Sequence, residues 1–198
     1  MWNERYDRQE YLFGTEPNAF LASCADLLVP GQSALAVADG EGRNSVWLAS
    51  RGLAVTAFDA STVGLEKARR LADQRQVTVD YCEAAVEDWD WTPAHFDVVA
   101  AIFIQFAGPD LRSRIFAGMK RTVKPGGLIL MQGYRPEQLA YGTGGPKEPE
   151  NLYTRALLEE AFADFEILRL EEHDSEVREG PGHAGLSALI DLVARRPR

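Results

Sequence analysis

The fold class is decided by the stretch Ala34-Leu35-Ala36-Val37-Ala38-Asp39-Gly40-Glu41-Gly42-Arg43-Asn44-Ser45. Its apolar start is typical of a buried strand, and two glycines then precede residues that can begin a helix. The run Val55-Thr56-Ala57-Phe58-Asp59 predicts a second strand that ends in a carboxylate. In a nucleoside-binding βαβ unit, glycines let the backbone approach the ligand, and an acid about 20 residues later takes the ribose hydroxyls.

This pattern narrows the ligand to two cofactor classes, nicotinamide dinucleotide or S-adenosylmethionine. A structural alternative exists for each part of it. Gly40 and Gly42 can serve turn geometry alone, and Asp59 can cap the helix expected near Ser61. The ordered combination of glycine turn and acidic strand end favours the ligand site.

Composition excludes several classes of protein. The 198 residues suffice for one α/β domain, and a net charge of −9 without a basic stripe argues against a nucleic-acid partner. No apolar run is long enough to cross a membrane, and residues 1–6 lack a signal-peptide pattern, so we expect a cytoplasmic protein. Cys24 and Cys82 have no metal-ligand or disulfide spacing, and no metal site is expected. We expect a monomer or homodimer.

Strand-like and helix-like segments alternate along the chain, which predicts a mostly parallel sheet flanked by helices. We expect an α/β, single-domain, Rossmann-like three-layer sandwich with seven strands, the last of them antiparallel. Strands are predicted at residues 33–38, 54–58, 77–82, 96–104, 128–131, 165–170 and 186–193. Helices are predicted from about Pro17, over 43–51, after a cap at Ser61 or Thr62, from Pro109, and over 154–163.

Two long connections are also expected. Residues 134–153 are rich in Gly and Pro and are predicted to be a functional loop, and residues 171–185 are predicted to form a wide hairpin connection. The single domain, residues 1–198, then divides into an amino-terminal lid segment and helix (1–30), a cofactor-binding core (31–133) and a substrate-side part (134–198).

The chain resembles the class I S-adenosylmethionine-dependent methyltransferases. The resemblance rests on the glycine turn, Phe58-Asp59, Phe96-Asp97-Val98-Val99 and Val123-Lys124-Pro125-Gly126-Gly127, in that order. The aromatic segments near Trp2 and Tyr11, the Gly-Glu-Gly-Arg-Asn turn and Gly180-x-x-His183-x-Gly185 are similar to the small bacterial group related to tellurite-resistance and thiopurine methyltransferases. In that group the aromatic amino-terminal segment closes over the cofactor.

Three positions depart from the family pattern. Ala36 stands where the first strand usually has an acid, and Ala38 stands where the family has glycine. Ala85 stands where an Asp often accepts from the adenine amino group, so the resemblance implies that backbone groups near Val86, and Glu87, read the adenine. Asp39 is positioned to supply the missing carboxylate.

The candidate cofactor-binding residues therefore come from the turn, the strand ends and the amino-terminal segment. They are Asp39, Gly40, Gly42, Asn44, Asp59, Ala60, Val86, Glu87, Tyr11 and Phe13. No catalytic residue is assigned, and the candidates are His183, Tyr134 and Gln105. Each has a structural alternative: Tyr11 and Phe13 as packing anchors, His183 as a turn residue, Tyr134 as a surface aromatic, and Gln105 as loop polarity.

Function is predicted as methyl transfer from S-adenosylmethionine to a small-molecule nucleophile. Such a displacement depends mainly on alignment and exclusion of water, so it does not require an obvious catalytic dyad. We expect the amino-terminal aromatic segment and residues 134–153 to form two sides of a lid. The alternatives are a nicotinamide-dinucleotide-dependent oxidoreductase and a non-catalytic nucleoside-binding module.

Overall fold

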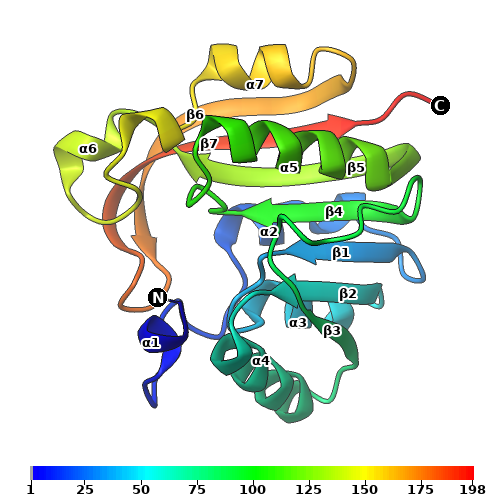
Figure 1. Cartoon of the computed structure of the whole chain (residues 1–198), viewed down its shortest axis with the longest axis vertical. Coiled ribbons are helices and arrows are strands. Elements are labelled where there is room, and N and C mark those ends of the chain that lie inside the picture. Colours follow the sequence, from blue (N-terminus) through cyan, green and yellow to red (C-terminus); the bar gives the residue numbers. More distant parts are fainter. Residues whose placement is uncertain (1) are drawn as a thin grey trace.

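The computed structural model describes residues 2–198, so Met1, part of the expected lid segment, lies outside the described residues. One sheet of seven strands runs through the molecule in the order β3-β2-β1-β4-β5-β7-β6 (Figure 1). The strands are β1 (Ser33–Val37), β2 (Ala54–Asp59), β3 (Val79–Glu83), β4 (Phe96–Ile102), β5 (Val123–Tyr134), β6 (Glu166–Arg178) and β7 (Ala184–Arg195). Only the pairs of β7 with β5 and β6 are antiparallel, which confirms the predicted single-domain fold.

Helices pack on both faces of this sheet (Figure 1). Side chains of α2 and α3 form one core layer with β1, β4 and β5, and side chains of α5 and α7 form the other. The helices are α1 (Trp2–Tyr6), α2 (Ala19–Ser23), α3 (Arg43–Ser50), α4 (Thr62–Arg75), α5 (Pro109–Thr122), α6 (Gln138–Tyr141) and α7 (Arg155–Ala161), with short 3-10 turns η1 (Ala25–Leu27) and η2 (Pro149–Asn151).

Local sequence signals explain where most helices begin. Ser61 accepts a hydrogen bond from the Gly64 N–H at the start of α4, and Thr154 accepts from Leu157 at the start of α7. Pro109 occupies the first turn of α5. These three starts confirm the sequence predictions, whereas α2 is capped by Asn18 and begins two residues after Pro17.

The predicted wide connection at residues 171–185 is wrong. β6 and β7 continue as a paired ladder to Arg178 and Ala184, so only residues 179–183 connect them. Residues 171–176 of β6 are polar and form part of an edge strand with no apolar alternation. Their backbone hydrogen bonds to β7, rather than buried side chains, hold them in the sheet.

The predicted loop at residues 134–153 also differs from the structure. Tyr134 is the last residue of β5, and the segment contains α6 and η2. Tyr134 and Tyr153 are both buried, so the interpretation of Tyr134 as a surface aromatic is wrong. Hydrophobic burial of the two rings fixes both ends of the segment against the core.

Within residues 2–198, no helix combines the length and the apolar character that crossing a bilayer needs.

Candidate functional site

The glycine turn lies between β1 and α3, at the carboxyl end of the parallel strands. Gly40 and Gly42 have φ of +63° and +92°, a region that side chains disfavour. A Cβ on Gly42 would lie 2.6 Å from the Cβ of Ala68, so this glycine lets α3 approach α4 closely. Gly40 has a second role, because its N–H donates to Asp59 over 2.8 Å.

Asp59 joins the turn to the end of β2. Its Oδ2 accepts from Gly40 and its Oδ1 accepts from the Ser61 N–H, each over 2.8 Å. Burial raises the pKa of this carboxyl, and the backbone hydrogen bonds oppose that rise. The two oxygens of a carboxylate can together accept about four hydrogen bonds, so Asp59 retains acceptor capacity for a ligand hydroxyl. Asp59 is therefore both a local cap and a group that suits a ribose.

Asp39 and Asn44 hold the turn in place. Asp39 accepts from the Ser45 N–H over 3.2 Å and from the Ser45 hydroxyl, and burial raises the pKa of this carboxyl to about 7. The amide oxygen of Asn44 accepts from the Asn18 N–H over 3.0 Å. Both side chains are committed to contacts within the protein.

A strap formed by residues 2–14 covers the turn. Tyr6 lies directly against Gly40, since a Cβ there would be 2.7 Å from the Tyr6 hydroxyl. Glu41 of the turn accepts from the N–H groups of Leu12 and Phe13. The strap is thus bonded to the same turn that carries the glycines.

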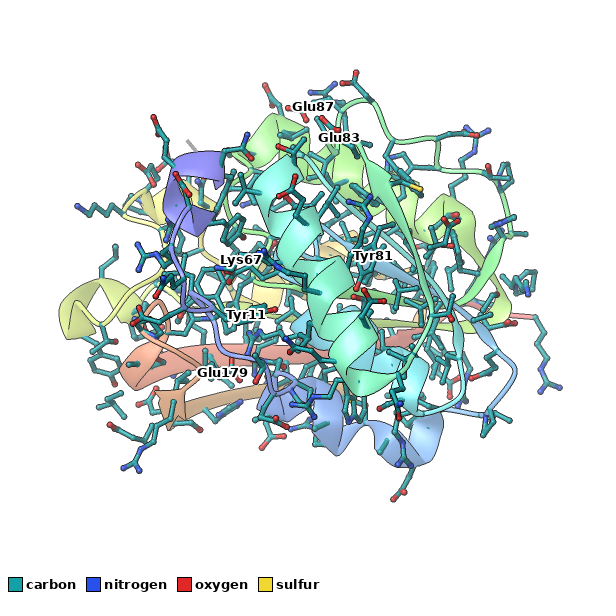
Figure 2. The ribbon with its side chains drawn as sticks, turned by 90° about the horizontal axis from the view of Figure 1, so that it is seen from below. Tyr11, Lys67, Tyr81, Glu83, Glu87 and Glu179 are labelled. Atoms are coloured by element: carbon teal, nitrogen blue, oxygen red, sulfur yellow. The ribbon has the colours of Figure 1, made fainter. Side chains whose placement is uncertain are left out.

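Lys67 of α4 fastens the strap from the other side. Its ammonium donates to the backbone carbonyls of Tyr6, Arg8 and Glu10 and lies 2.5 Å from Glu41. Both side chains of this ion pair are 2% exposed. Figure 2 shows Lys67 beside Tyr11, whose ring centroid is 5.0 Å from the ammonium.

The two aromatic candidates of the strap, Tyr11 and Phe13, lie in different surroundings. The Tyr11 hydroxyl donates to the Lys67 carbonyl, and the ring packs near Val46 and Tyr81, as expected for an anchor. Phe13 faces the interior instead. Its ring centroid lies 6.3 Å from that of Tyr6 and 4.4 Å from that of His183.

His183 is the centre of an aromatic cluster, defined as Phe13, Phe103, Tyr134 and His183. The imidazole lies 4.5 Å from the Phe103 ring centroid and 5.9 Å from that of Tyr134. His183 belongs to the tight turn between β6 and β7, and Phe103 follows β4. Burial lowers the pKa of His183, so the ring is neutral at pH 7.

The remaining candidates lie at two separate positions, one at the end of β5 and the other near the ends of β2 and β3. The Gln105 amide bonds to both backbone groups of Tyr134 and to the Asn151 carbonyl, so it braces the end of β5. Val86 is buried in the core near Phe58, whereas Ala60 and Glu87 are exposed. Figure 2 shows Glu87 far from Glu179. The Ala84 N–H donates to the Asp59 carbonyl and ties this loop to β2.

Sequence reasoning did not single out Glu41, Arg43, Lys67 or Glu179. Arg43 lies 2.8 Å from Glu179, which also accepts from Asn18 and from the Ala19 N–H. Burial opposes ionisation of Glu179, but His183, Arg43 and the Ala19 N–H together lower its pKa to about 2. Arg43 stood in the glycine motif, but no local pattern pairs it with a residue of the turn between β6 and β7.

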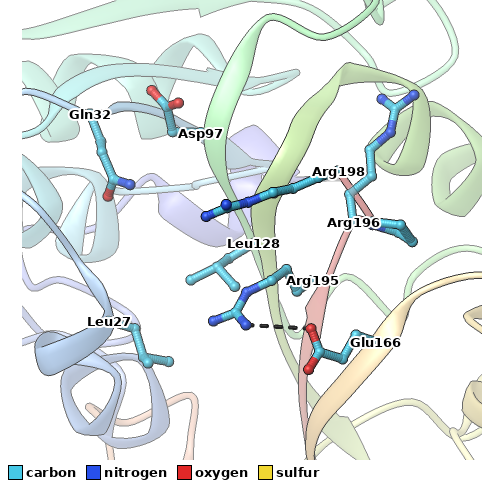
Figure 3. Close-up of a pocket in the computed structure, with 10 residues that line it drawn as sticks. Leu27, Gln32, Asp97, Leu128, Glu166, Arg195, Arg196 and Arg198 are labelled. Carbon is cyan, nitrogen blue, oxygen red and sulfur yellow. Dashed lines mark hydrogen bonds and ion pairs between the residues drawn. The ribbon is translucent and has the colours of Figure 1, made fainter.

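A hollow of about 440 Å³ lies at the opposite end of the sheet (Figure 3). It is lined by residues next to the amino ends of β1 and β4 and by the carboxyl-terminal arginines, including Gln32, Asp97, Arg195 and Arg198. Arg195 pairs there with Glu166. This hollow is remote from the glycine turn and contains none of the candidate site residues.

Comparison with known proteins agrees with this geometry. Residues 34–127 match a family described as a methyltransferase domain. The matched segment begins in β1, contains the glycine turn and Asp59, and ends in the Pro-Gly-Gly run. Residues 34–127 therefore constitute a methyltransferase domain. The predicted family, fold class and S-adenosylmethionine as the cofactor of the domain are thereby confirmed.

One curated relative is an uncharacterized methyltransferase of Synechocystis, 31% identical over 54% of this chain and 50% of the relative. The chain spans about half the length of the curated relatives it matches. In fold, the chain is similar to TehB from Haemophilus influenzae, with a TM-score of 0.73 and 16% identity over 98% of this chain and 65% of that one. A protein that converts a disulfide bond into a thioacetal group in echinomycin biosynthesis has a TM-score of 0.80 and 19% identity, over 98% and 88%.

The residues of the site suit the nucleoside part of S-adenosylmethionine. The free acceptor positions of Asp59 suit ribose hydroxyls, and the exposed Ala60 and Glu87 leave the adenine side open. Tyr6 lies against Gly40, so the strap covers the turn where the methionine part would lie. The groups at the turn and at Asp59 fit the cofactor.

Proposed function

We propose that this protein transfers the methyl group of S-adenosylmethionine to a small-molecule nucleophile. The observation that carries the proposal is the hydrogen bond between Gly40 and Asp59 inside the matched methyltransferase segment. It links the turn that would hold the methionine part to the carboxylate that would hold the ribose. The acidic net charge of −9 supports a small acceptor rather than a nucleic acid.

The cofactor supplies an electrophilic methyl group when bound, and the chain's residues align the acceptor and exclude water. Tyr6 and Phe13 cover one side of the crevice, and Phe103 and Tyr134 form the other. These aromatic side chains keep water from the nucleophile. Three further residues hold these aromatic side chains in place: Tyr11, Asn44 and Gln105.

We assign His183 the role of proton acceptor. Glu179 lies 3.9 Å from Nδ1 and favours the tautomer that carries its hydrogen there, which leaves Nε2 as the basic atom. As the acceptor heteroatom bonds to the methyl carbon and the sulfur–carbon bond breaks, the acceptor proton passes to Nε2.

Ligand-induced stabilisation tests the proposal. S-adenosylhomocysteine at about 100 times its Kd should stabilise the folded protein by about 2.7 kcal/mol, because it binds only the native state. The measurement is a thermal-unfolding titration, with NAD as the matched control ligand. Stabilisation by NAD alone would support the oxidoreductase, and methyl transfer would then be rejected. Binding of the product without methylation of any acceptor would favour the non-catalytic module.

A further inference from the structure

Three buried polar atoms near the aromatic cluster have no hydrogen-bond partner within residues 2–198. They are Arg43 Nη1, His183 Nδ1 and Tyr134 Oη. Arg43 is 6% exposed and Tyr134 is 1% exposed. An unpaired buried donor costs free energy, so proteins rarely keep one without a reason. Three in one neighbourhood indicate a ligand group that satisfies them.

The three side chains converge on one place. Arg43 Nη2 and His183 Nδ1 face the same oxygen of Glu179, at 2.8 and 3.9 Å. The second distance is too long for a hydrogen bond. The ring centroids of His183 and Tyr134 are 5.9 Å apart. The neighbourhood therefore contains one guanidinium arm, one imidazole nitrogen and one phenol that remain free to donate.

Their place in the sheet separates this cluster from the nucleoside end of the crevice. Asp59 ends β2 and Val86 follows β3, on one side of the junction between β1 and β4. Tyr134 ends β5 and His183 follows β6, on the other side of that junction. Arg43, at the start of α3, reaches across this junction to Glu179. The unpaired donors therefore lie on the side left for the methyl acceptor.

The chemistry of the donors selects an oxygen anion. A guanidinium binds a carboxylate through parallel N–H bonds, and a phenol adds a further donor. Glu179 does not fill this role, because Asn18, the Ala19 N–H and Arg43 Nη2 already satisfy it and leave Nη1 unused. The rings of Phe13 and Phe103 beside the donors suit an apolar or aromatic body.

We propose that Arg43, Tyr134 and His183 form a binding site for a carboxylate carried by the methyl acceptor. The inference rests on the proposed methyl transfer and names its substrate class, a small apolar or aromatic acid. The carboxylate lies between Arg43 Nη1 and the Tyr134 hydroxyl. The nucleophilic atom of the same molecule then lies nearer the glycine turn.

The test uses benzoate as the probe and neutral benzamide as its matched control, titrated calorimetrically with and without saturating S-adenosylhomocysteine. Benzoate should bind about tenfold or more tightly than benzamide, the scale of one charge-assisted hydrogen bond. Arg43→Lys keeps a cation for Glu179 but removes the second arm, and Tyr134→Phe removes only the phenol oxygen. Each should reduce benzoate affinity about tenfold and leave benzamide unchanged.

Controls separate this inference from its alternatives. Arg114→Lys, on the exposed face of α5, should leave benzoate affinity unchanged. Equal binding of benzoate and benzamide, or unchanged benzoate affinity in both variants, overturns the proposal. If Arg43→Lys instead weakens S-adenosylhomocysteine but not methylthioadenosine, which lacks the amino acid part, the site reads the cofactor carboxylate and the acceptor assignment is wrong. Benzoate binding without any S-adenosylhomocysteine binding would reject methyl transfer while retaining the acid site.

Discussion

At the scale of single residues, buried charge is concentrated around the glycine turn. Asp39, Asp59 and Glu41 are all buried or partly buried there, and each accepts hydrogen bonds from backbone N–H groups. Only Asp59 lies at a strand end that faces the expected ribose. The cap of α4 is Ser61 itself, and Asp59 accepts from the Ser61 N–H, so Asp59 also holds the start of that helix.

Asp59→Asn should weaken S-adenosylhomocysteine binding by about 1.5–3 kcal/mol, the scale of a hydrogen bond to a charged group. The amide keeps the size of the side chain but exchanges an acceptor oxygen for a donor. Isothermal titration measures the change. Asp97→Asn is the matched control, since that carboxylate pairs with Lys124 at the far end of the sheet. Unchanged affinity in Asp59→Asn would leave Asp59 with a capping role only.

At the scale of elements, the strap, α4 and the glycine turn form one unit. The buried ion pair of Lys67 and Glu41 joins α4 to the glycine turn. Three carbonyls of the strap accept hydrogen bonds from the same Lys67 ammonium. By contrast, the pair of Arg75 and Glu16 links α4 to the segment just after the strap through exposed side chains. Solvent screens the exposed pair, so the two pairs differ in strength.

Lys67→Met should release the strap. Breaking a buried ion pair costs about 3–5 kcal/mol, because it leaves Glu41 charged and unpaired. Amide hydrogen exchange at Leu12 and Phe13 should accelerate, while the central strands β4 and β5 keep their protection. Arg75→Met, on the same helix, should change stability by at most about 1 kcal/mol. Equal rates of amide hydrogen exchange at Leu12 and Phe13 in the two variants would contradict the role of Lys67 in holding the strap.

At the scale of the whole molecule, two buried carboxyl groups set opposite dependences of stability on pH. Glu179 has its pKa lowered from 4.5 to about 2, so its contribution is present above pH 4.5 and is lost as the pH falls toward 2. Asp39 has its pKa raised from 3.8 to about 7, so the folded state binds the extra proton and loses stability as the pH rises from 3.8 to 7.

The free energy of unfolding should therefore be greatest near pH 4–5 as far as these two groups determine it. Urea unfolding from pH 2 to 8 measures this profile. Glu179→Gln should flatten the acid side, and Asp39→Asn should flatten the decline toward neutral pH. An acid side that stays equally steep in Glu179→Gln would show that other carboxylates govern it.

The sequence by itself determined the order of the elements, the parallel core and the cofactor class. Those signals are local: apolar runs, the glycine turn, Asp59 at a strand end, and caps at Ser61 and Thr154. Hydrogen-bond geometry between neighbouring residues makes such signals readable without a structure.

Only the tertiary structure decided how the crevice is closed and which charges surround the acceptor side. Lys67 donates to the carbonyls of Tyr6 and Glu10, and Arg43 pairs with Glu179 in the turn after β6, across long stretches of chain. The polar half of β6 gave no strand signal, because edge pairing needs no apolar alternation. These contacts depend on which surfaces the fold buries together, and no periodicity within a segment encodes that choice.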